Sequence, residues 1–202
     1  MEKIRIGIMG GTFDPIHNGH LILAEYSRTN FNLDKVLFIP TGRPPHKDNK
    51  YISSNLHRLN MTLLAINSNP YFELSTIEMD REKTTYTIDT IKYLQSKYKN
   101  RDFYFILGSD SLYQIDKWKD YENLLKICNF IVAKRPSQEA DSIEDWIKKL
   151  REEYNSLIYP LELPLIEISS TQIRERVKRG LSIKYLVPQS VEFYIEKNKL
   201  YR

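Results

Sequence analysis

Short apolar runs recur along the chain, separated by longer segments of mixed polarity. The runs are Ile4–Met9, Val36–Pro40, Phe103–Leu107, Phe130–Ala133 and Leu165–Ile168. Because they are continuous rather than alternating, they are typical of strands that a parallel sheet buries on both faces. A further extended segment is expected around Phe72–Glu78.

The segments between these runs have helical patterns. We expect helices at residues 20–29, 56–66, 87–98, 142–154, 171–179 and 191–197. Strand–helix alternation requires crossover connections, so it predicts an α/β fold: a Rossmann-like, doubly wound parallel sheet with a short helical C-terminal part. The chain shows no internal repeat, low-complexity tract or linker, and we therefore expect one domain over residues 1–202.

Composition narrows the class of protein. Hydrophobic residues make up 41% and charged residues 28% of the chain, as in soluble globular proteins. We find no apolar segment near the ~18 residues of a membrane span and no signal-peptide core, so we expect a cytoplasmic protein without membrane contact. The single cysteine, Cys128, agrees with a reducing compartment and has the apolar neighbours of a core residue.

The charge balance favours small anionic ligands over nucleic acid. The chain carries 30 basic and 26 acidic residues, a net charge of +4. This excess suits anionic small molecules, but it is too slight and too dispersed to indicate a nucleic-acid surface. The sequence does not decide the oligomeric state, and both a monomer and a homo-oligomer are compatible with it.

The run Gly10–His20, GGTFDPIHNGH, directly follows the first predicted strand. Glycines at a strand end let backbone N–H groups approach an anion closely, and the helix that follows points its positive end at the same place. His17 and His20 add two donors that can stabilise developing negative charge. The arrangement favours an enzyme that handles nucleotides.

This run also has simpler explanations. It could be a tight turn with solvated histidines, or paired histidines could bind zinc. A zinc site lacks further ligands, because the chain has four histidines and one distant cysteine, so no metal site of protein ligands is expected. The run matches neither G-x-x-x-x-G-K-[ST] nor G-x-G-x-x-G, which argues against a Walker-type NTPase and a standard dinucleotide dehydrogenase.

Ligands of doubly wound sheets bind beyond the carboxyl ends of the strands, an edge that we call the carboxyl edge. The rule places Gly10–His20, Thr41–Lys47, Gly108–Asp110 and Ser169–Thr171 there. The hydroxyls of Ser169–Thr171, with Arg174 one turn later, could bind a polyphosphate, although such residues are also ordinary helix caps.

Other residues at this edge have both a binding and a structural interpretation. Asp110 could accept from a ribose hydroxyl, hold a metal through water, or cap a helix. Trp118, expected within the next helical stretch, could stack on a planar ring or pack in the core. Residues Thr85–Thr87 precede a helix whose N-terminus prefers a carboxylate, or they only cap it. Arg135, His46 and Lys47 could reach phosphates or stay solvated.

The chain resembles the bacterial nicotinate-mononucleotide adenylyltransferases. The H-x-G-H element of Gly10–His20 marks only the nucleotidyltransferase superfamily, whereas Ile168–Arg174, ISSTQIR, narrows the resemblance together with Thr85–Thr87, Gly108–Asp110 and Trp118. It covers essentially the whole chain. It implies the nucleotidyltransferase type of Rossmann-like fold, a requirement for Mg²⁺ bound mainly through ATP phosphates, and transfer of AMP from ATP to nicotinate mononucleotide.

The same resemblance implies roles for individual residues. The predicted catalytic residues are His17, His20 and Arg174. The predicted ATP-binding residues are Gly10, Gly11, Thr12, Phe13, Gly108, Asp110, Arg135, Ile168, Ser169, Ser170 and Thr171. The predicted substrate-binding residues are His46, Lys47, Thr85, Tyr86, Thr87 and Trp118, with Trp118 stacking on the pyridine ring and His46 and Lys47 at the mononucleotide phosphate.

Several alternatives stay open at this point. A phosphopantetheine adenylyltransferase shares the first motif but is usually shorter and has no evident use for Thr85–Thr87 and Trp118. A preference for nicotinamide mononucleotide is disfavoured by the carboxylate-seeking helix end. Class I aminoacyl-tRNA synthetases need a K-M-S-K-S-like segment that the chain lacks. A non-catalytic nucleotide sensor would not need His17, His20 and Arg174 together.

Overall fold

The computed structural model describes residues 3–43, 52–81, 83–134, 140–164 and 166–202. Six strands form one sheet in the order β3-β2-β1-β4-β5-β6, and every neighbouring pair is parallel. The strands are β1 (Ile4–Gly11), β2 (Lys35–Pro40), β3 (Phe72–Leu74), β4 (Arg101–Gly108), β5 (Asn129–Lys134) and β6 (Leu157–Glu162). The predicted doubly wound α/β fold is confirmed.

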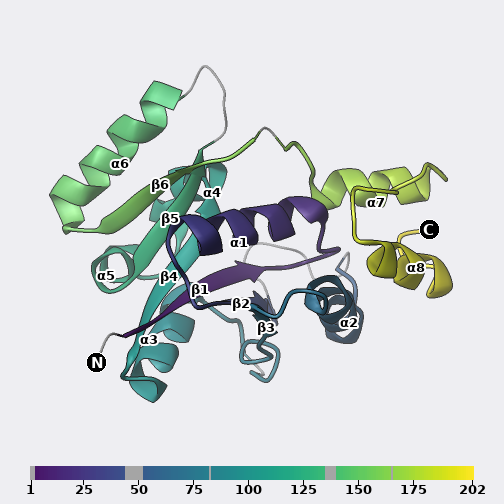
Figure 1. Ribbon diagram of the computed structural model, residues 1–202, viewed down its shortest axis with the longest axis horizontal. Coiled ribbons are helices and arrows are strands. Elements are labelled where there is room, and N and C mark those ends of the chain that lie inside the picture. The colour runs from purple at the N-terminus through teal and green to yellow at the C-terminus, as the bar shows by residue number, and fades with distance from the viewer. Residues whose placement is uncertain (1–2, 44–51, 82, 135–139, 165) are drawn as a thin grey trace.

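Helices cover both faces of the sheet (Figure 1). Those that pack on one face are α3 (Thr87–Lys97), α4 (Ser109–Tyr113), the 3₁₀ helix η2 (Ile115–Lys117), α5 (Tyr121–Ile127) and α6 (Ala140–Tyr154). Those on the other face are α1 (Asn18–Asn30), α2 (Asn55–Ile66), α7 (Ser170–Lys178) and α8 (Gln189–Lys197). No helix in the described ranges has both the length and the apolar character that crossing a bilayer requires.

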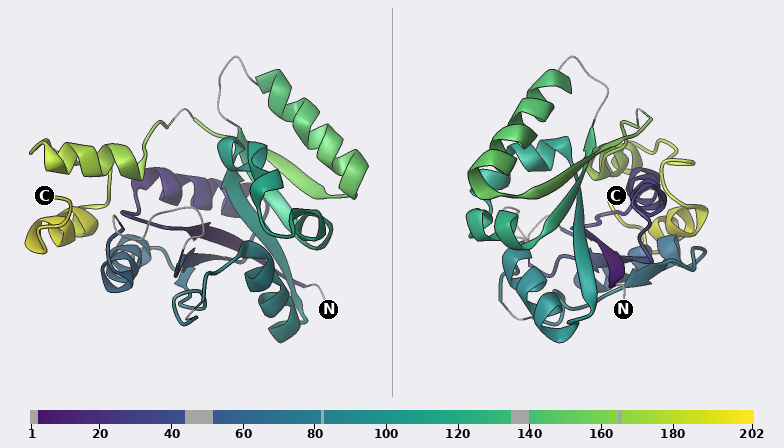
Figure 2. Two further views of the ribbon diagram at one scale, coloured as in Figure 1. Left: turned by 180° about the vertical axis from the view of Figure 1, so that it is seen from behind. Right: turned by 60° about the vertical axis from the view of Figure 1, so that its left-hand side comes forward.

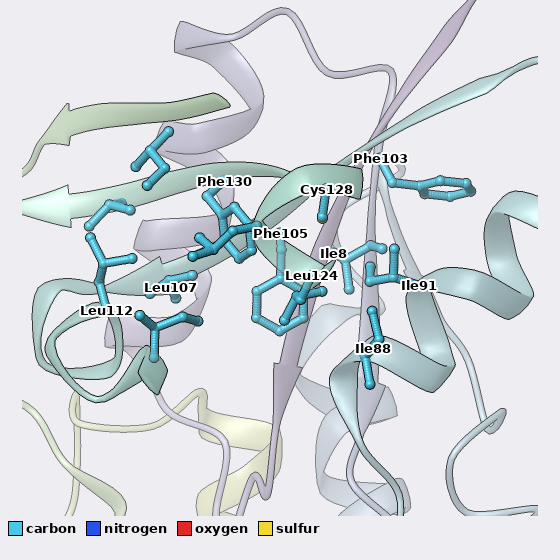
Figure 3. Packing of buried hydrophobic residues seen from close by; sticks show 14 of the residues in the cluster. Ile8, Ile88, Ile91, Phe103, Phe105, Leu107, Leu112, Leu124, Cys128 and Phe130 are labelled. Carbon is cyan, nitrogen blue, oxygen red and sulfur yellow. The ribbon is translucent and has the colours of Figure 1, made fainter. Parts of the chain in front are cut away.

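Alternate residues of the central strands supply the two cores. In β4, Phe103, Phe105 and Leu107 belong to the core under α3 and α5, whereas Tyr104 and Ile106 belong to the opposite one. Figure 3 shows Phe105 and Phe130 packed with residues of α3 and α5 around them. Cys128 lies in this core as expected, buried and free.

One predicted strand was wrong. Residues 166–168 form no strand, and the sixth strand is Leu157–Glu162 instead. That strand pairs only with β5, has three exposed residues and contains Pro160. Proline cannot donate to a sheet ladder and is tolerated at an edge, so this strand lacks the continuous apolar run of its buried neighbours.

The C-terminal helices lie at the end of the sheet toward which β1 runs. Figures 1 and 2 both place α7 and α8 there, beside α2 and the start of α1. Asn18 fixes part of this arrangement, because its backbone N–H donates to the Leu186 carbonyl at 2.9 Å and its side chain to the Tyr185 carbonyl at 2.6 Å. The C-terminal part of the chain is thereby brought to the carboxyl edge.

Candidate active site

A cavity of about 520 Å³ lies at the carboxyl ends of β1, β2 and β4. The predicted site residues that line it are Gly10, Gly11, Thr12, His20, Thr85, Tyr86, Thr87, Gly108 and Trp118. The structure thus brings together residues from three of the predicted clusters. His46, Lys47 and Arg135 lie outside the described residues.

The turn after β1 is shaped by its small and aromatic residues. Phe13 is 2% exposed and has a φ of 51°, so its ring folds back under the turn. A Cβ on Gly11 would come within 2.8 Å of that ring, which leaves room only for glycine. The Phe13 ring also meets the His20 ring edge-on, with centroids 5.1 Å apart. Phe13 therefore supports the site from below instead of lining the cavity.

The two histidines lie against each other at the start of α1. Their ring centroids are 3.7 Å apart, and the His17 backbone N–H donates to His20 Nδ1 at 3.2 Å. The helix begins at Asn18 with His17 as its N-cap, two residues before the predicted start. A Cβ on Gly19 would come within 3.1 Å of His17 Nδ1, so the glycine between the histidines leaves space for the His17 ring.

Burial sets the protonation state of His17. Its side chain is almost inaccessible, and burial lowers its pKa from 6.5 to about 4. His17 Nδ1 is a buried polar atom without a hydrogen-bond partner among the described residues. A neutral imidazole carries one N–H donor, which can bind a phosphate oxygen.

The motif Ile168–Arg174 contacts the turn after β1 directly. The Ser170 hydroxyl donates to the Pro15 carbonyl at 2.8 Å, and Arg174 Nη1 donates to the Asp14 carbonyl at 2.8 Å. Residues 155 and 160 positions apart in sequence therefore meet beside the turn after β1. The predicted convergence of the two motifs is confirmed.

Some hydroxyls of the second element have structural partners. Ser169 caps α7 by accepting from the Gln172 N–H at 3.2 Å, and Thr171 Oγ1 accepts from Arg174 Nη2 at 3.2 Å. Ile168 packs against the core beneath α1 and α7. None of the residues Ile168–Arg174 lines the cavity itself, so this element borders the cavity at its α1 side.

The start of α3 forms the opposite wall. Tyr86 is the N-cap, and its carbonyl accepts from the N–H groups of both Asp89 and Thr90, whereas the N–H groups of Thr87 and Ile88 have no acceptor within the helix. Thr85 is 2% exposed and lies beside the buried Glu78, whose carboxylate its hydroxyl helps to stabilise. This end of the cavity offers donors to an anion.

Gly108, at the end of β4, and Trp118, which packs against β4, line the cavity. Trp118 packs edge-on against Phe105, with ring centroids 5.8 Å apart, which leaves its indole among the lining side chains. It does not lie within a helix as expected, because it ends η2 ahead of α5. Asp110 is exposed in the first turn of α4 and is not among the cavity-lining residues.

Two charged residues of the cavity were missed by the sequence analysis. Glu78 is buried, which raises its pKa, and its Oε1 accepts from the Thr90 hydroxyl at 2.8 Å. Lys119 pairs with Asp89 at 3.1 Å, and its Nζ lies 4.4 Å from the centre of the Tyr86 ring. Lys119 directly follows the predicted Trp118, whereas Glu78 stands in no motif that could have marked it.

Comparisons with known proteins identify the family of the chain. The family model for cytidylyltransferase-like proteins matches residues 8–176. A protein of Thermoanaerobacter sp. (strain X514), named a probable nicotinate-nucleotide adenylyltransferase, is 52% identical over 100% of this chain and 96% of its own length. The chain belongs to the nicotinate-nucleotide adenylyltransferase family. A relative of Moorella thermoacetica with the same name is 48% identical to this adenylyltransferase over 98% of the chain and 92% of its own length.

Solved structures of the family have the same architecture. The Plasmodium falciparum nicotinic acid mononucleotide adenylyltransferase complexed with NaAD superimposes with a TM-score of 0.82 and is 27% identical, covering 98% of this adenylyltransferase and 97% of that chain. A putative nicotinate-nucleotide adenylyltransferase of Vibrio parahaemolyticus, 18% identical with a TM-score of 0.70, shares the fold over 100% of this chain and 96% of its own.

Proposed function

We propose that this protein transfers AMP from ATP to nicotinate mononucleotide, forming nicotinate adenine dinucleotide and pyrophosphate. The observation that carries the proposal is the pair of hydrogen bonds from Ser170 and Arg174 to Pro15 and Asp14. They set the N-terminus of α7 beside the histidine pair, next to a cavity with room for a second nucleotide. Donors from both motifs can then surround a single triphosphate.

The reaction is a direct in-line displacement. A phosphate oxygen of the mononucleotide forms a bond to the α-phosphorus of ATP, while the bond from that phosphorus to the bridging oxygen breaks and pyrophosphate leaves. The attacking oxygen is already ionised at neutral pH, so neither a general base nor a covalent enzyme intermediate is needed. The protein aligns the two phosphates and stabilises the charge that develops on the leaving group.

The residues divide between the two substrates. His17, His20, Arg174 and the α7 N-terminus stabilise the ATP phosphates, and the glycine turn admits the nucleotide at the end of β1. Trp118 presents its ring to the pyridine, and the first turn of α3 faces the carboxylate with Lys119 beside it. We assign His46 and Lys47 to the phosphate of the mononucleotide, and Arg135 to ATP, as the resemblance implies.

Mg²⁺ belongs to the proposal as an ion that ATP brings with it. Over the described ranges, no three His, Cys, Asp or Glu side chains gather into a metal site. This donor set fits an ion held chiefly by substrate phosphates, which is usual for Mg²⁺. Asp110 would hold it through water, and when bound the ion neutralises phosphate charge. We further expect the enzyme to act in the cytoplasm, and sedimentation would show whether it forms a homo-oligomer.

The deciding experiment is pyrophosphate release from ATP with three candidate acceptors. Nicotinate mononucleotide should give the fastest release, nicotinamide mononucleotide a slower one and 4′-phosphopantetheine none above background. Faster turnover with phosphopantetheine would overturn the proposal. ATP binding without pyrophosphate release with any acceptor would identify a sensor instead.

A further inference from the structure

We infer that Tyr201 is a positioning residue for the turn that carries the histidine pair. The inference rests on the proposed function and adds to it a residue that lies in neither motif. The Tyr201 hydroxyl donates to Asp14 Oδ1 at 2.7 Å, across 187 positions of sequence. Tyr201 does not line the cavity, so it can act on the reaction only through its neighbours, and its shortest hydrogen bond is the one to Asp14.

Asp14 is the point at which four segments of the chain meet. Its side chain is 3% exposed, so its carboxylate needs donors within the protein. One oxygen accepts from Tyr201, and the other accepts from the Ser53 backbone N–H at 3.3 Å. Its backbone carbonyl accepts from Arg174 on α7. Tyr201 and Arg174 thereby hold the same residue through different atoms.

The surroundings of Tyr201 are built to present its hydroxyl. Its φ is 63°, a conformation in which residues other than glycine are uncommon, so contacts of the side chain must keep it there. The hydroxyl also contacts Met61 Sδ of α2 at 3.9 Å. Burial and the neighbouring Asp14 charge raise the pKa of Tyr201, which keeps the hydroxyl protonated as a donor.

The position of Asp14 connects this contact to the chemistry. Asp14 follows Phe13, whose ring supports His20, and precedes His17 by three residues. A shift of this segment would misalign the histidines without removing any group that binds substrate. Small misplacements of aligned groups cost rate steeply, up to about 10²-fold for 1 Å. Loss of the Tyr201 hydroxyl should therefore lower kcat and leave KM nearly unchanged.

The experiment compares Tyr201→Phe with Tyr194→Phe. The Tyr194 hydroxyl is a matched control, because it also follows α7, is partly buried and makes two hydrogen bonds, one with His57 Nδ1 at 3.0 Å and one that it accepts from Asn60 at 2.9 Å. Neither partner belongs to the turn after β1. We expect Tyr201→Phe to lower kcat about 5- to 20-fold with the KM for ATP within about threefold, and Tyr194→Phe to keep kcat within about twofold.

A second variant tests the route through Asp14. Asp14→Asn keeps the shape of the side chain but weakens its acceptors, and it should lower kcat as Tyr201→Phe does. The double variant should be no slower than the slower single variant, because the two residues act as a unit. Thermal unfolding of each variant shows whether the folded state persists under assay conditions.

The outcomes separate this inference from the proposed function. A wild-type enzyme without adenylyltransferase activity would remove the proposed function. An active wild type with normal kcat in Tyr201→Phe, or in Asp14→Asn, would overturn only the inference, as would full multiplication of the two effects in the double variant. Equal losses of kcat in Tyr201→Phe and Tyr194→Phe would show general destabilisation and would overturn it too.

Discussion

The imidazole rings of His17 and His20 stack with their centroids 3.7 Å apart. Two imidazolium ions would repel each other strongly at this distance, so the stack is compatible with at most one charge. Burial already keeps His17 neutral at pH 7 by lowering its pKa to about 4. In the proposed mechanism the pair would therefore stabilise phosphate charge chiefly by hydrogen bonding, which needs correct placement of each ring.

Removing either imidazole should cost turnover. We expect His17→Ala and His20→Ala each to lower kcat by roughly 10²-fold or more, since each removes a donor to charge that develops in the transition state. Steady-state pyrophosphate release checks this. His57→Ala is the control, because His57 lies on α2 against Tyr194 and belongs to neither of the two motifs. Near-normal turnover in both alanine variants would remove the pair from the mechanism.

The stability of the protein should depend on pH through His17. Its pKa is about 4 in the folded chain against an ordinary value of 6.5, so between these values the unfolded chain binds a proton that the folded chain does not. The contribution is complete above pH 6.5 and is lost as the pH falls toward 4. From pH 7 to pH 5 we expect His17 to account for a loss of roughly 2 kcal/mol.

Urea unfolding at pH 7 and pH 5 measures this loss. His17→Asn removes the titrating group while keeping a small polar side chain, so the variant should lose less stability over this interval than the wild type. Equal losses in the two proteins would show that His17 does not titrate with a lowered pKa.

Arg58 should be a main source of stability for the turn after β1. It is 1% exposed, and its guanidinium donates to the carbonyls of Thr12, Gly42 and Ser53 and to the Asn55 side chain. Arg58→Met would leave three carbonyls without this donor, and we expect a loss of about 3 kcal/mol in the free energy of unfolding.

The control for Arg58 is an exposed ion pair. Lys92 on α3 pairs with Asp120 at 3.2 Å near the surface, and Lys92→Met should cost less than about 1 kcal/mol. Chemical denaturation of the two variants gives both values. A loss for Arg58→Met as small as that for Lys92→Met would contradict a structural role for the buried guanidinium.

The buried strands could be predicted from sequence because their environment is uniform. The β4 run Phe103–Leu107 is apolar throughout since helices cover both of its faces, and the structure extends that strand by only a few residues. The edge strand β6 was missed because one side has no partner strand and half of its residues are exposed. A helical stretch was expected around Trp118, but α4 and α5 could not be given bounds, since each spans two turns or fewer, too little for a periodic pattern.

The strand predicted at residues 165–168 was wrong for a different physical reason. A Cβ on Gly19 would lie 3.7 Å from Ile166, and Ile168 packs against the core near α7. Ile166 is apolar because it covers the start of α1, and Ile168 because it packs on the core, not because either belongs to a strand. The connection between β6 and α7 is thus part of the packing that surrounds the histidines.

Sequence motifs predicted those parts of the candidate site that are built from one short stretch of backbone. Gly10–His20 and Ser169–Arg174 could be recognised because a glycine turn and a helix start need particular residues at fixed spacing. Glu78, Lys119 and Tyr201 could not, since each is a single side chain that the fold carries to the cavity or to the turn beside it. Their neighbours in sequence follow no pattern that depends on this role.

Lys119 should contribute to the preference for the acid over the amide mononucleotide. Its ammonium lies beside the first turn of α3, paired with Asp89 and close to Tyr86, where the carboxylate of the proposed substrate would sit. A unit charge at about 4 Å in a largely solvated setting contributes about 1 kcal/mol to the binding of an anion. Lys119→Met should therefore lower kcat/KM for nicotinate mononucleotide about fivefold and change kcat/KM for nicotinamide mononucleotide little.

The control is Lys92→Met, which removes a lysine that also pairs with an aspartate near α3 but does not line the cavity. It should leave the ratio of the two kcat/KM values unchanged. An equal fall in kcat/KM for both substrates would mean that Lys119 supports the wall of the cavity and does not distinguish the carboxylate from the amide.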